Sequence, residues 1–191
     1  MSNIIEIYKK NDSLVPETLK TWEQNVDQWC KEYEKKVDYC QLTEIIIDLS
    51  VFIFDCIEER VVLAYAISTK ALNKRDASRI RGFPNVNAST MKSDDENKFK
   101  SDKGHFLGHA SGGQLDINLF PHRTGLNRGW SKEGKIFRKL ERYVAKYTGT
   151  FFYHRPIYND NTWVPSFLEY GVLKEDKLWE VEVFTNSGVS V

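Results

Sequence analysis

The sequence has few cysteines, no Cys-x-x-Cys pair and no long apolar run. Cys30, Cys40 and Cys56 are the only cysteines among 191 residues, and this odd number argues against both a disulfide framework and a zinc site. The longest apolar stretches, 45–47 and 51–54, are separated by an aspartate, so neither is long enough to span a bilayer. These absences favour a chain with free thiols and no membrane partner.

The first residues also lack the features of a targeting segment. Residues 1–11 are too polar to form a cleavable signal peptide. We therefore expect a cytoplasmic protein, or one exported without such a signal. A length of 191 residues fits one domain, or a compact domain with a smaller elaboration at one end.

The formal net charge of zero conceals an uneven distribution of charge. Residues 1–70 carry −5, residues 71–146 carry +8, and residues 147–191 carry −3. Clustered lysine and arginine attract phosphates and release their counterions. A basic middle segment therefore indicates an anionic partner, although a solvated surface alone would show the same pattern.

Hydrophobic periodicity predicts helices near both ends of a strand-rich chain. Apolar residues at three- and four-residue steps predict a helix from Pro16 to about Lys36, and a similar face over 136–147 predicts a second one that ends at Gly149. Residues 44–55 and 61–69 are expected to form a β-hairpin. Further strands are expected at 78–83, 150–158, 167–173 and 178–184, with a surface loop at 84–100. The predicted fold class is α+β with an antiparallel sheet.

Four short motifs follow one another in the middle of the chain. Several glycines, among them Gly104 and Gly108, make a long helix improbable there, so His105 and His109 do not share a helical face as in zinc proteases. The segment is expected to be strand and loop. The motifs are Asp102-Lys103-Gly104-His105, Asn118-Leu119-Phe120-Pro121, Leu126-Asn127-Arg128-Gly129 and Lys139-Leu140-Glu141.

The residue types in these motifs suit cleavage of a phosphodiester bond. This reaction needs a base that titrates near neutral pH, which histidine supplies, and a hard cation that stabilises the developing charge. Asparagine and glutamate offer oxygen ligands of the kind that Mg²⁺ prefers.

In order and spacing the motifs resemble those of the DNA/RNA non-specific endonucleases, which are ββα-metal or His-Me finger nucleases. The resemblance covers about 61–184 and is most secure over 101–146. It implies a ββα-metal core, with His105 as general base and Lys103 beside it. It also implies that Asn118 braces the loop between the strands. Asn127 and Glu141 would hold Mg²⁺ or another divalent cation such as Mn²⁺.

Two departures from the family pattern affect this interpretation. Lys103 stands where many relatives have arginine, which keeps the charge but loses the bidentate fork. An insertion of about six residues, 130–136, precedes the second helix, so Glu133 also competes for the role of the acid. We favour Glu141 because its Arg-Lys-Leu-Glu-Arg context matches the helix of the family.

Basic residues near these motifs are candidates for contacts with the nucleic-acid backbone. A solvated helix face is the alternative explanation for those in the second helix. The candidates are Arg79, Arg81, Arg128, Arg138, Lys139 and Arg142.

The resemblance divides the chain into a nuclease domain at 59–191 and an N-terminal elaboration at 1–58, within one compact unit. The expected function is endonucleolytic hydrolysis of DNA, RNA or both with little sequence specificity, as in a toxin or defence effector. The alternative is a non-catalytic nucleic-acid-binding or adaptor module. Because an unspecific nuclease endangers its own cell, an immunity or regulatory protein is an expected partner. The aromatic N-terminal helix would either dock that partner or cover one face of the sheet.

Overall fold

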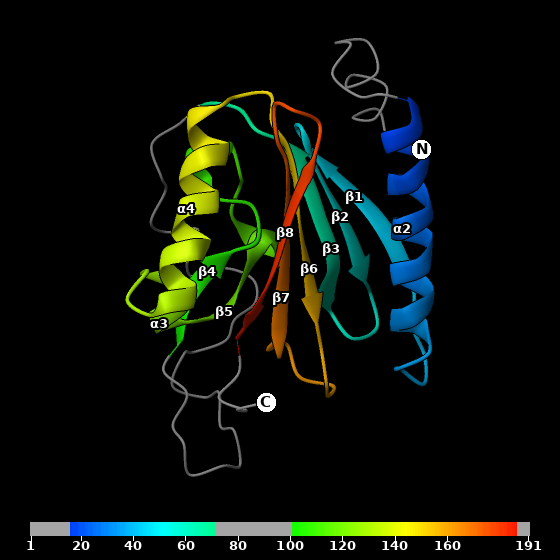
Figure 1. Ribbon diagram of the computed structural model, residues 1–191. Coiled ribbons are helices and arrows are strands. Elements are labelled where there is room, and N and C mark those ends of the chain that lie inside the picture. The colour runs from blue at the N-terminus through cyan, green and yellow to red at the C-terminus, as the bar shows by residue number, and fades with distance from the viewer. Residues whose placement is uncertain (1–15, 72–100, 187–191) are drawn as a thin grey trace.

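The computed structural model describes residues 16–71 and 101–186 and shows an α+β protein built on antiparallel strands (Figure 1). Six strands form one sheet in the order β1-β2-β3-β6-β7-β8, and two more form a separate hairpin, β4-β5. Within these residues no helix is long and apolar enough to cross a membrane. The elements are α2 (Pro16–Glu34), β1 (Leu42–Ile47), β2 (Ser50–Asp55), β3 (Arg60–Ile67), β4 (Ser101–His105), η2 (His109–Ser111), η3 (Asp116–Asn118), β5 (Leu119–Arg123), α3 (Thr124–Asn127), α4 (Lys132–Lys146), β6 (Phe151–Ile157), β7 (Phe167–Leu173) and β8 (Trp179–Thr185).

The segment 44–55 is two strands, so its prediction as one strand of a hairpin is wrong. Asp48 has a φ of 52°, and the chain reverses there so that Ile47 pairs with Ser50. Aspartate tolerates the left-handed conformation better than a β-branched residue such as the preceding Ile47. The expected hairpin is therefore a three-stranded meander. The first predicted helix and the strands after residue 149 agree with the structure to within about two residues, whereas the second helix begins at Lys132, four residues before the predicted apolar face.

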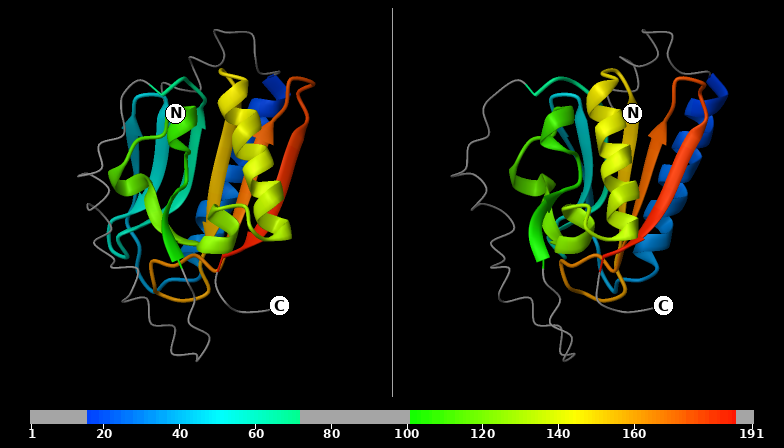
Figure 2. Two further views of the ribbon diagram at one scale, coloured as in Figure 1. Left: turned by 90° about the vertical axis from the view of Figure 1, so that its left-hand side faces the viewer. Right: turned by 60° about the vertical axis from the view of Figure 1, so that its left-hand side comes forward.

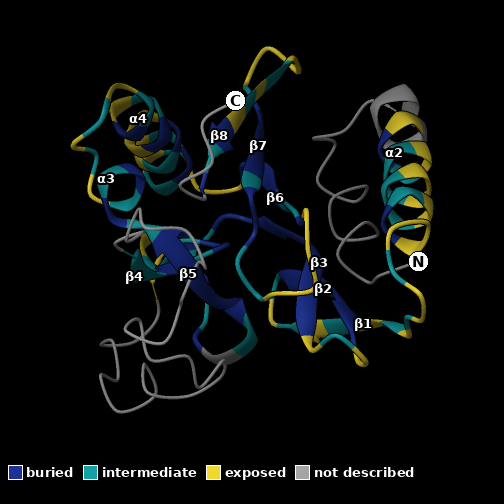
Figure 3. Cartoon of the chain, turned by 90° about the horizontal axis from the view of Figure 1, so that it is seen from below, coloured by how far each residue is buried: buried dark blue, intermediate teal, exposed yellow. Residues whose placement is uncertain are grey.

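The molecule has three layers, with the six-stranded sheet in the middle. Helix α2 covers one face of the sheet, and the β4-β5 hairpin with α3 and α4 covers the other (Figures 1 and 2). The buried residues are concentrated in the sheet between the two outer layers (Figure 3). The two halves of the chain on either side of 58/59 meet in this sheet, where β2 pairs with β3. The division of the chain into two domains at that point stays a prediction.

Helix α4 attaches the candidate site to the sheet through an apolar face. Its buried side chains include Phe137, Leu140 and Val144. The Phe137 ring lies against Tyr170 of β7 and Phe184 of β8, with centroid separations of 5.5 and 5.3 Å. The helix begins after Ser131, whose Oγ accepts a hydrogen bond from the backbone of Gly134. Such a cap fixes the start of the helix.

Helix α2 is attached through an aromatic cluster. Trp22 is 2% exposed, and its ring packs against Tyr65, Phe151 and Tyr153 at centroid separations of 4.9 to 5.2 Å. Because this side chain is buried against the sheet, the structure favours the alternative in which the helix covers one face of the sheet. An aromatic stripe centred on Trp22 is not available to dock a partner.

Two of the predicted nucleic-acid contacts, Arg79 and Arg81, lie outside the described residues. The same is true of the strand expected at 78–83 and the loop expected at 84–100. These expectations stay predictions.

We expect Trp22→Ala to lower the free energy of unfolding by about 3–5 kcal/mol, the usual cost of removing a buried large aromatic side chain. The matched control is Tyr39→Ala, because Tyr39 is 79% exposed and its loss should change stability by less than about 0.5 kcal/mol. Urea titration of the three proteins measures both values. Equal stability of the Trp22 variant and the wild type would contradict the attachment of α2 through this cluster.

Candidate active site

The four motifs lie on consecutive elements that pack together. Strands β4 and β5 form an antiparallel hairpin in which Gly104 pairs with Phe120 and His105 with Leu119. Helices α3 and α4 follow at once in the chain, and Phe137 of α4 lies 4.9 Å from the ring of His122 on β5. The resulting unit of two strands and a helix rests on the six-stranded sheet (Figure 2).

The side-chain amide of Asn118 holds the loop that follows β4. Its Oδ1 accepts a hydrogen bond from the backbone N–H of Leu107 at 2.8 Å, and its Nδ2 donates to the carbonyl oxygens of Leu107 and Gln114. Asn118 is fully buried, so these bonds replace those that the amide would make to water. The loop after His105 is thereby fixed to the start of β5. This placement makes Asn118 a positioning residue.

Asp102 ties strand β4 to helix α3. Its Oδ2 accepts hydrogen bonds from Asn127 Nδ2 at 3.2 Å and Arg128 Nε at 2.8 Å, and its Oδ1 accepts one from Arg128 Nη2 at 2.7 Å. The hydrogen bonds from Arg128 hold the pKa of Asp102 below its ordinary value, against the opposing effect of burial. Paired, charge-assisted bonds of this kind fix geometry as well as charge. The contribution of Asp102 was missed from the sequence, which gives no sign of its partner.

Lys103 and His105 lie in the second half of β4, where both are half-buried. Strand β4 pairs with the strand that carries His122. His105, the predicted general base, lies at the end of β4. It stands between the part of β4 that Asp102 bonds to α3 and the loop that Asn118 holds.

Gly104 is required by a close approach between the two strands. A Cβ added at this position would lie 2.4 Å from the Cβ and 2.6 Å from the Nδ1 of His122. The His122 ring stacks on Phe120, with centroids 4.8 Å apart, so it cannot turn aside without leaving the core. The glycine before His105 thus has a packing reason that its position in the motif did not reveal.

The two candidate acids lie at opposite ends of this unit. Glu133 makes an ion pair with Arg123, and Arg123 pairs with Ser101 at the end of the hairpin remote from His105. Glu141 is eight residues further along α4, or about 12 Å at 1.5 Å per residue. Its Oε1 lies 3.7 Å from the position of a Cβ on Gly108, three residues after His105. The geometry therefore favours Glu141 as the acid on the His105 side.

Glu141 is held by a neighbouring arginine on its own helix. Arg138 Nη1 donates to its Oε2 at 2.6 Å, and the Glu141 side chain is 21% exposed. Burial raises the pKa of Glu141, and the nearby charge of Arg138 opposes that effect. The ion pair uses one carboxylate oxygen and directs the other toward Gly108.

The oxygen atoms in this unit fit a hard divalent cation that keeps most of its waters. Asn127 donates to Asp102 through Nδ2, which orients the amide and leaves Oδ1 as an oxygen ligand. Within 16–71 and 101–186 no three His, Cys, Asp or Glu side chains are grouped to hold a metal. Mg²⁺ needs few protein ligands because it keeps several waters, so its binding by Asn127 and Glu141 stays a prediction.

Some of the basic residues predicted to contact nucleic acid are already paired with carboxylates of the protein. Arg128 binds Asp102 and lies 5.0 Å from the ring centroid of Trp130, while Arg138 binds Glu141. Lys139 and Arg142 are exposed on α4. Arg128 and Arg138 are thus structural ion-pair partners, and a contact of any of the four with a phosphate stays a prediction.

Two buried histidines support the site from within the core. His122 and His154 are each about 1% exposed, and His154 lies 3.9 Å from the ring centroid of Tyr170. Burial lowers the pKa of His154 to about 3, and burial together with the charge of His154 lowers the pKa of His122. Both are therefore neutral at pH 7, and their burial favours a packing role in the core.

No protein-family model and no curated protein matches the chain. Among solved structures, the chain is similar to a chain in the "Crystal structure of the EndoG/EndoGI complex: Mechanism of EndoG inhibition". The TM-score is 0.43 with 15% sequence identity, over 85% of this chain and 81% of that one.

We expect Gly104→Ala to lower the free energy of unfolding by about 1–3 kcal/mol, because the added methyl group overlaps His122. Removing the obstruction with His122→Gly, which takes away the Cβ as well as the ring, should abolish most of that penalty, so the two changes should be non-additive in a double-mutant cycle. The control is Gly125→Ala, where the nearest atom to a new Cβ is 4.0 Å away. Equal effects of the two glycine substitutions would contradict the overlap.

The buried histidines also predict a pH dependence of stability. Because the folded-state pKa of His154, about 3, lies below its unfolded value of 6.5, the unfolded chain binds more protons between these values. Stability is therefore complete above pH 6.5 and falls as the pH drops toward 3. Between pH 7.5 and 5 this histidine alone should cost about 2 kcal/mol. In urea titrations His154→Gln should remove that part of the slope, and an unchanged slope would contradict the assignment.

Proposed function

We propose that the chain is a metal-dependent endonuclease that hydrolyses phosphodiester bonds of DNA, RNA or both with little sequence specificity. The single observation that carries the proposal is the Asp102 bond to Asn127. It attaches the strand that bears His105 to the helix that bears the predicted metal ligand. The order of strand, strand and helix agrees with the ββα-metal arrangement that the motifs imply.

In this proposal His105 acts as the general base and accepts a proton from the attacking water. Asn118 fixes the loop beside it through the bonds to Leu107, and Lys103 supplies a positive charge for the scissile phosphate. Asn127 Oδ1 and the Glu141 carboxylate would hold Mg²⁺ or Mn²⁺. When bound, such a cation stabilises the negative charge that develops on the phosphate and the leaving oxygen.

The nucleic-acid backbone would follow the exposed side of α4. Lys139 and Arg142 point away from the buried face formed by Phe137 and Leu140. Contacts of this kind are independent of base sequence, which agrees with low specificity. They should also make binding weaker at high salt.

The biological role we propose is that of a toxin or defence effector, since such a nuclease must be restrained in the cell that makes it. Restraint requires an immunity or regulatory protein. Because Trp22 is buried against the sheet, that partner would bind elsewhere than on an aromatic stripe of α2.

The test is digestion of plasmid DNA and of RNA by the purified chain with Mg²⁺ and with EDTA. We expect Mg²⁺-dependent cleavage that falls at least about 100-fold in His105→Ala, the usual contribution of a general base. His109→Ala is the matched control. His109 lines a separate cavity with Asp48 and Thr69, and none of the proposed catalytic residues lines that cavity. Absence of Mg²⁺-dependent cleavage of any nucleic acid would contradict the proposal.

The metal ligands give a second test. Asn127→Ala and Glu141→Ala should each raise the Mg²⁺ concentration needed for half-maximal activity, by about 10- to 100-fold on the scale of disturbed metal sites. Glu133→Ala should change it little, because that carboxylate is already held in an ion pair with Arg123. A Glu133 variant that is inactive beside an active Glu141 variant would reverse the assignment of the acid.

A further inference from the structure

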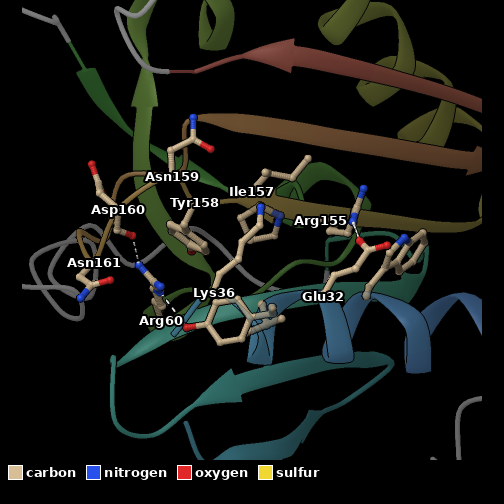
Figure 4. Close-up of a pocket in the computed structure, with 13 residues that line it drawn as sticks. Glu32, Lys36, Arg60, Arg155, Ile157, Tyr158, Asn159, Asp160 and Asn161 are labelled. Carbon is tan, nitrogen blue, oxygen red and sulfur yellow. Dashed lines mark hydrogen bonds and ion pairs between the residues drawn. The ribbon is translucent and has the colours of Figure 1, made fainter. Parts of the chain in front are cut away.

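A second cavity lies on the opposite side of the sheet from the candidate active site. It has a volume of about 400 Å³ and lies between the end of α2, the start of β3 and the turn after β6. Figure 4 shows Arg60 toward one end of this pocket and the Arg155–Glu32 pair toward the other, with Lys36 between them in this view. The volume falls within the range of small-molecule sites.

Arg60 brings a buried positive charge to this pocket. The residue is 4% exposed. Its Nε donates to the Tyr33 hydroxyl at 2.8 Å, and its Nη1 donates to the backbone carbonyl oxygens of Asp160 and Thr162 at 2.7 and 2.8 Å. All three acceptors are uncharged, and Nη2 takes part in none of these bonds. The buried carboxylate of Asp55, the cross-strand partner of Arg60, reaches the guanidinium through the Tyr33 hydroxyl and not by a direct ion pair.

The environment of Arg60 is rigid, so its position is set before any ligand arrives. Its guanidinium carbon lies 4.2 Å from the ring centroid of Tyr158 and 5.2 Å from that of Tyr33. The Tyr33 hydroxyl in turn donates to Asp55 at 2.8 Å. The backbone hydrogen bonds that Asp55 accepts from Ile57 and Gln41 outweigh its burial and hold its pKa below the ordinary value.

The carboxylates that line the pocket are already engaged within the protein. Glu32 accepts hydrogen bonds on both oxygens, from Gln28 and Arg155. Asp160 Oδ1 accepts two from Thr162, through its backbone N–H and its hydroxyl. Glu32 is thus paired with another cation, and neither carboxylate makes a direct ion pair with Arg60.

Further donors lie around the opening. Lys36 is exposed at the end of α2, and Asn159 and Asn161 are exposed on the turn after β6. An ammonium, a guanidinium nitrogen and side-chain amides together offer more donors than the two oxygens of one carboxylate can use. Three or four oxygens on one group match them better, as in a phosphate.

We propose that this pocket binds a phosphate group, either as the free ion or as the phosphomonoester of a small molecule. Arg60 Nη2 and Lys36 Nζ donate to the phosphate oxygens. The apolar walls formed by Tyr158, Pro156 and Ile157 leave room for an organic part. The proposal does not depend on nuclease activity, because α2, which lines the pocket, and α4, which carries Glu141, lie on different faces of the sheet (Figure 1).

The test is calorimetric titration of the full chain with inorganic phosphate and with a nucleoside 5′-monophosphate, in EDTA and at constant ionic strength. We expect saturable binding of at least one of them, and a tighter nucleotide would identify the phosphomonoester as the ligand. Lys36→Gln should weaken binding roughly fivefold, as for loss of one solvent-exposed charge contact. The matched control, Lys35→Gln, should leave it unchanged, because Lys35 is exposed but does not line the pocket.

Three results would overturn the proposal. They are no saturable binding of either phosphate compound, equal affinity of the Lys36 variant and the wild type, and tighter binding of citrate than of phosphate. Because Lys36 is on the surface, its variant should fold. The test therefore does not require the more disruptive removal of Arg60.

Discussion

The Asp102 carboxylate is the contact on which the candidate active site depends. It joins β4 to the end of α3 through three hydrogen bonds, two of them from the Arg128 guanidinium. Without it, the strand that carries His105 and the helix that carries Asn127 would be related through the pairing of β4 with β5 and through apolar packing, and no side-chain hydrogen bond from Asp102 would fix the Asn127 amide. Catalytic groups need precise placement, and paired hydrogen bonds to an ionised carboxylate supply it.

The six-stranded sheet separates two polar regions that have different supports. On one face, the apolar side of α4 packs through Phe137 and carries Glu141 toward the loop after β4. On the other face, Trp22 attaches α2 to the sheet. The C-terminal part of α2 forms one wall of the cavity beside Arg60. Each region uses a helix that is anchored by aromatic residues and presents polar side chains beyond them. Damage to one anchor should therefore affect one region more than the other.

Much of this architecture could be predicted because apolar periodicity is a local property. The spacing of apolar residues alone predicted the buried faces of α2 and α4 and the strands after residue 149. The turn at Asp48 was not, because a single polar residue in an apolar segment does not reveal a positive φ. The reason for Gly104 was likewise hidden, since the His122 side chain that fills its place is 18 positions away in the sequence.

The residues of the candidate site were predicted from ordered motifs, but their supports were not. Asp102 gains its role from Arg128 across a tertiary contact, and the separation of Glu133 from Glu141 became clear only once Arg123 was placed at the far end of the hairpin. The Arg60 cavity brings together α2, β3 and the turn after β6, three segments without a shared motif. Long-range contacts of this kind leave no periodic trace in a sequence.

The most direct test of the central claim is a crystal structure of the chain grown with Mn²⁺, with the metal located by its anomalous scattering. The account predicts a Mn²⁺ ion bound by Asn127 Oδ1, with the Glu141 carboxylate in or beside its water shell and His105 facing the same space. A structure with no metal at Asn127, or with metal only at remote carboxylates such as Asp160, would contradict it.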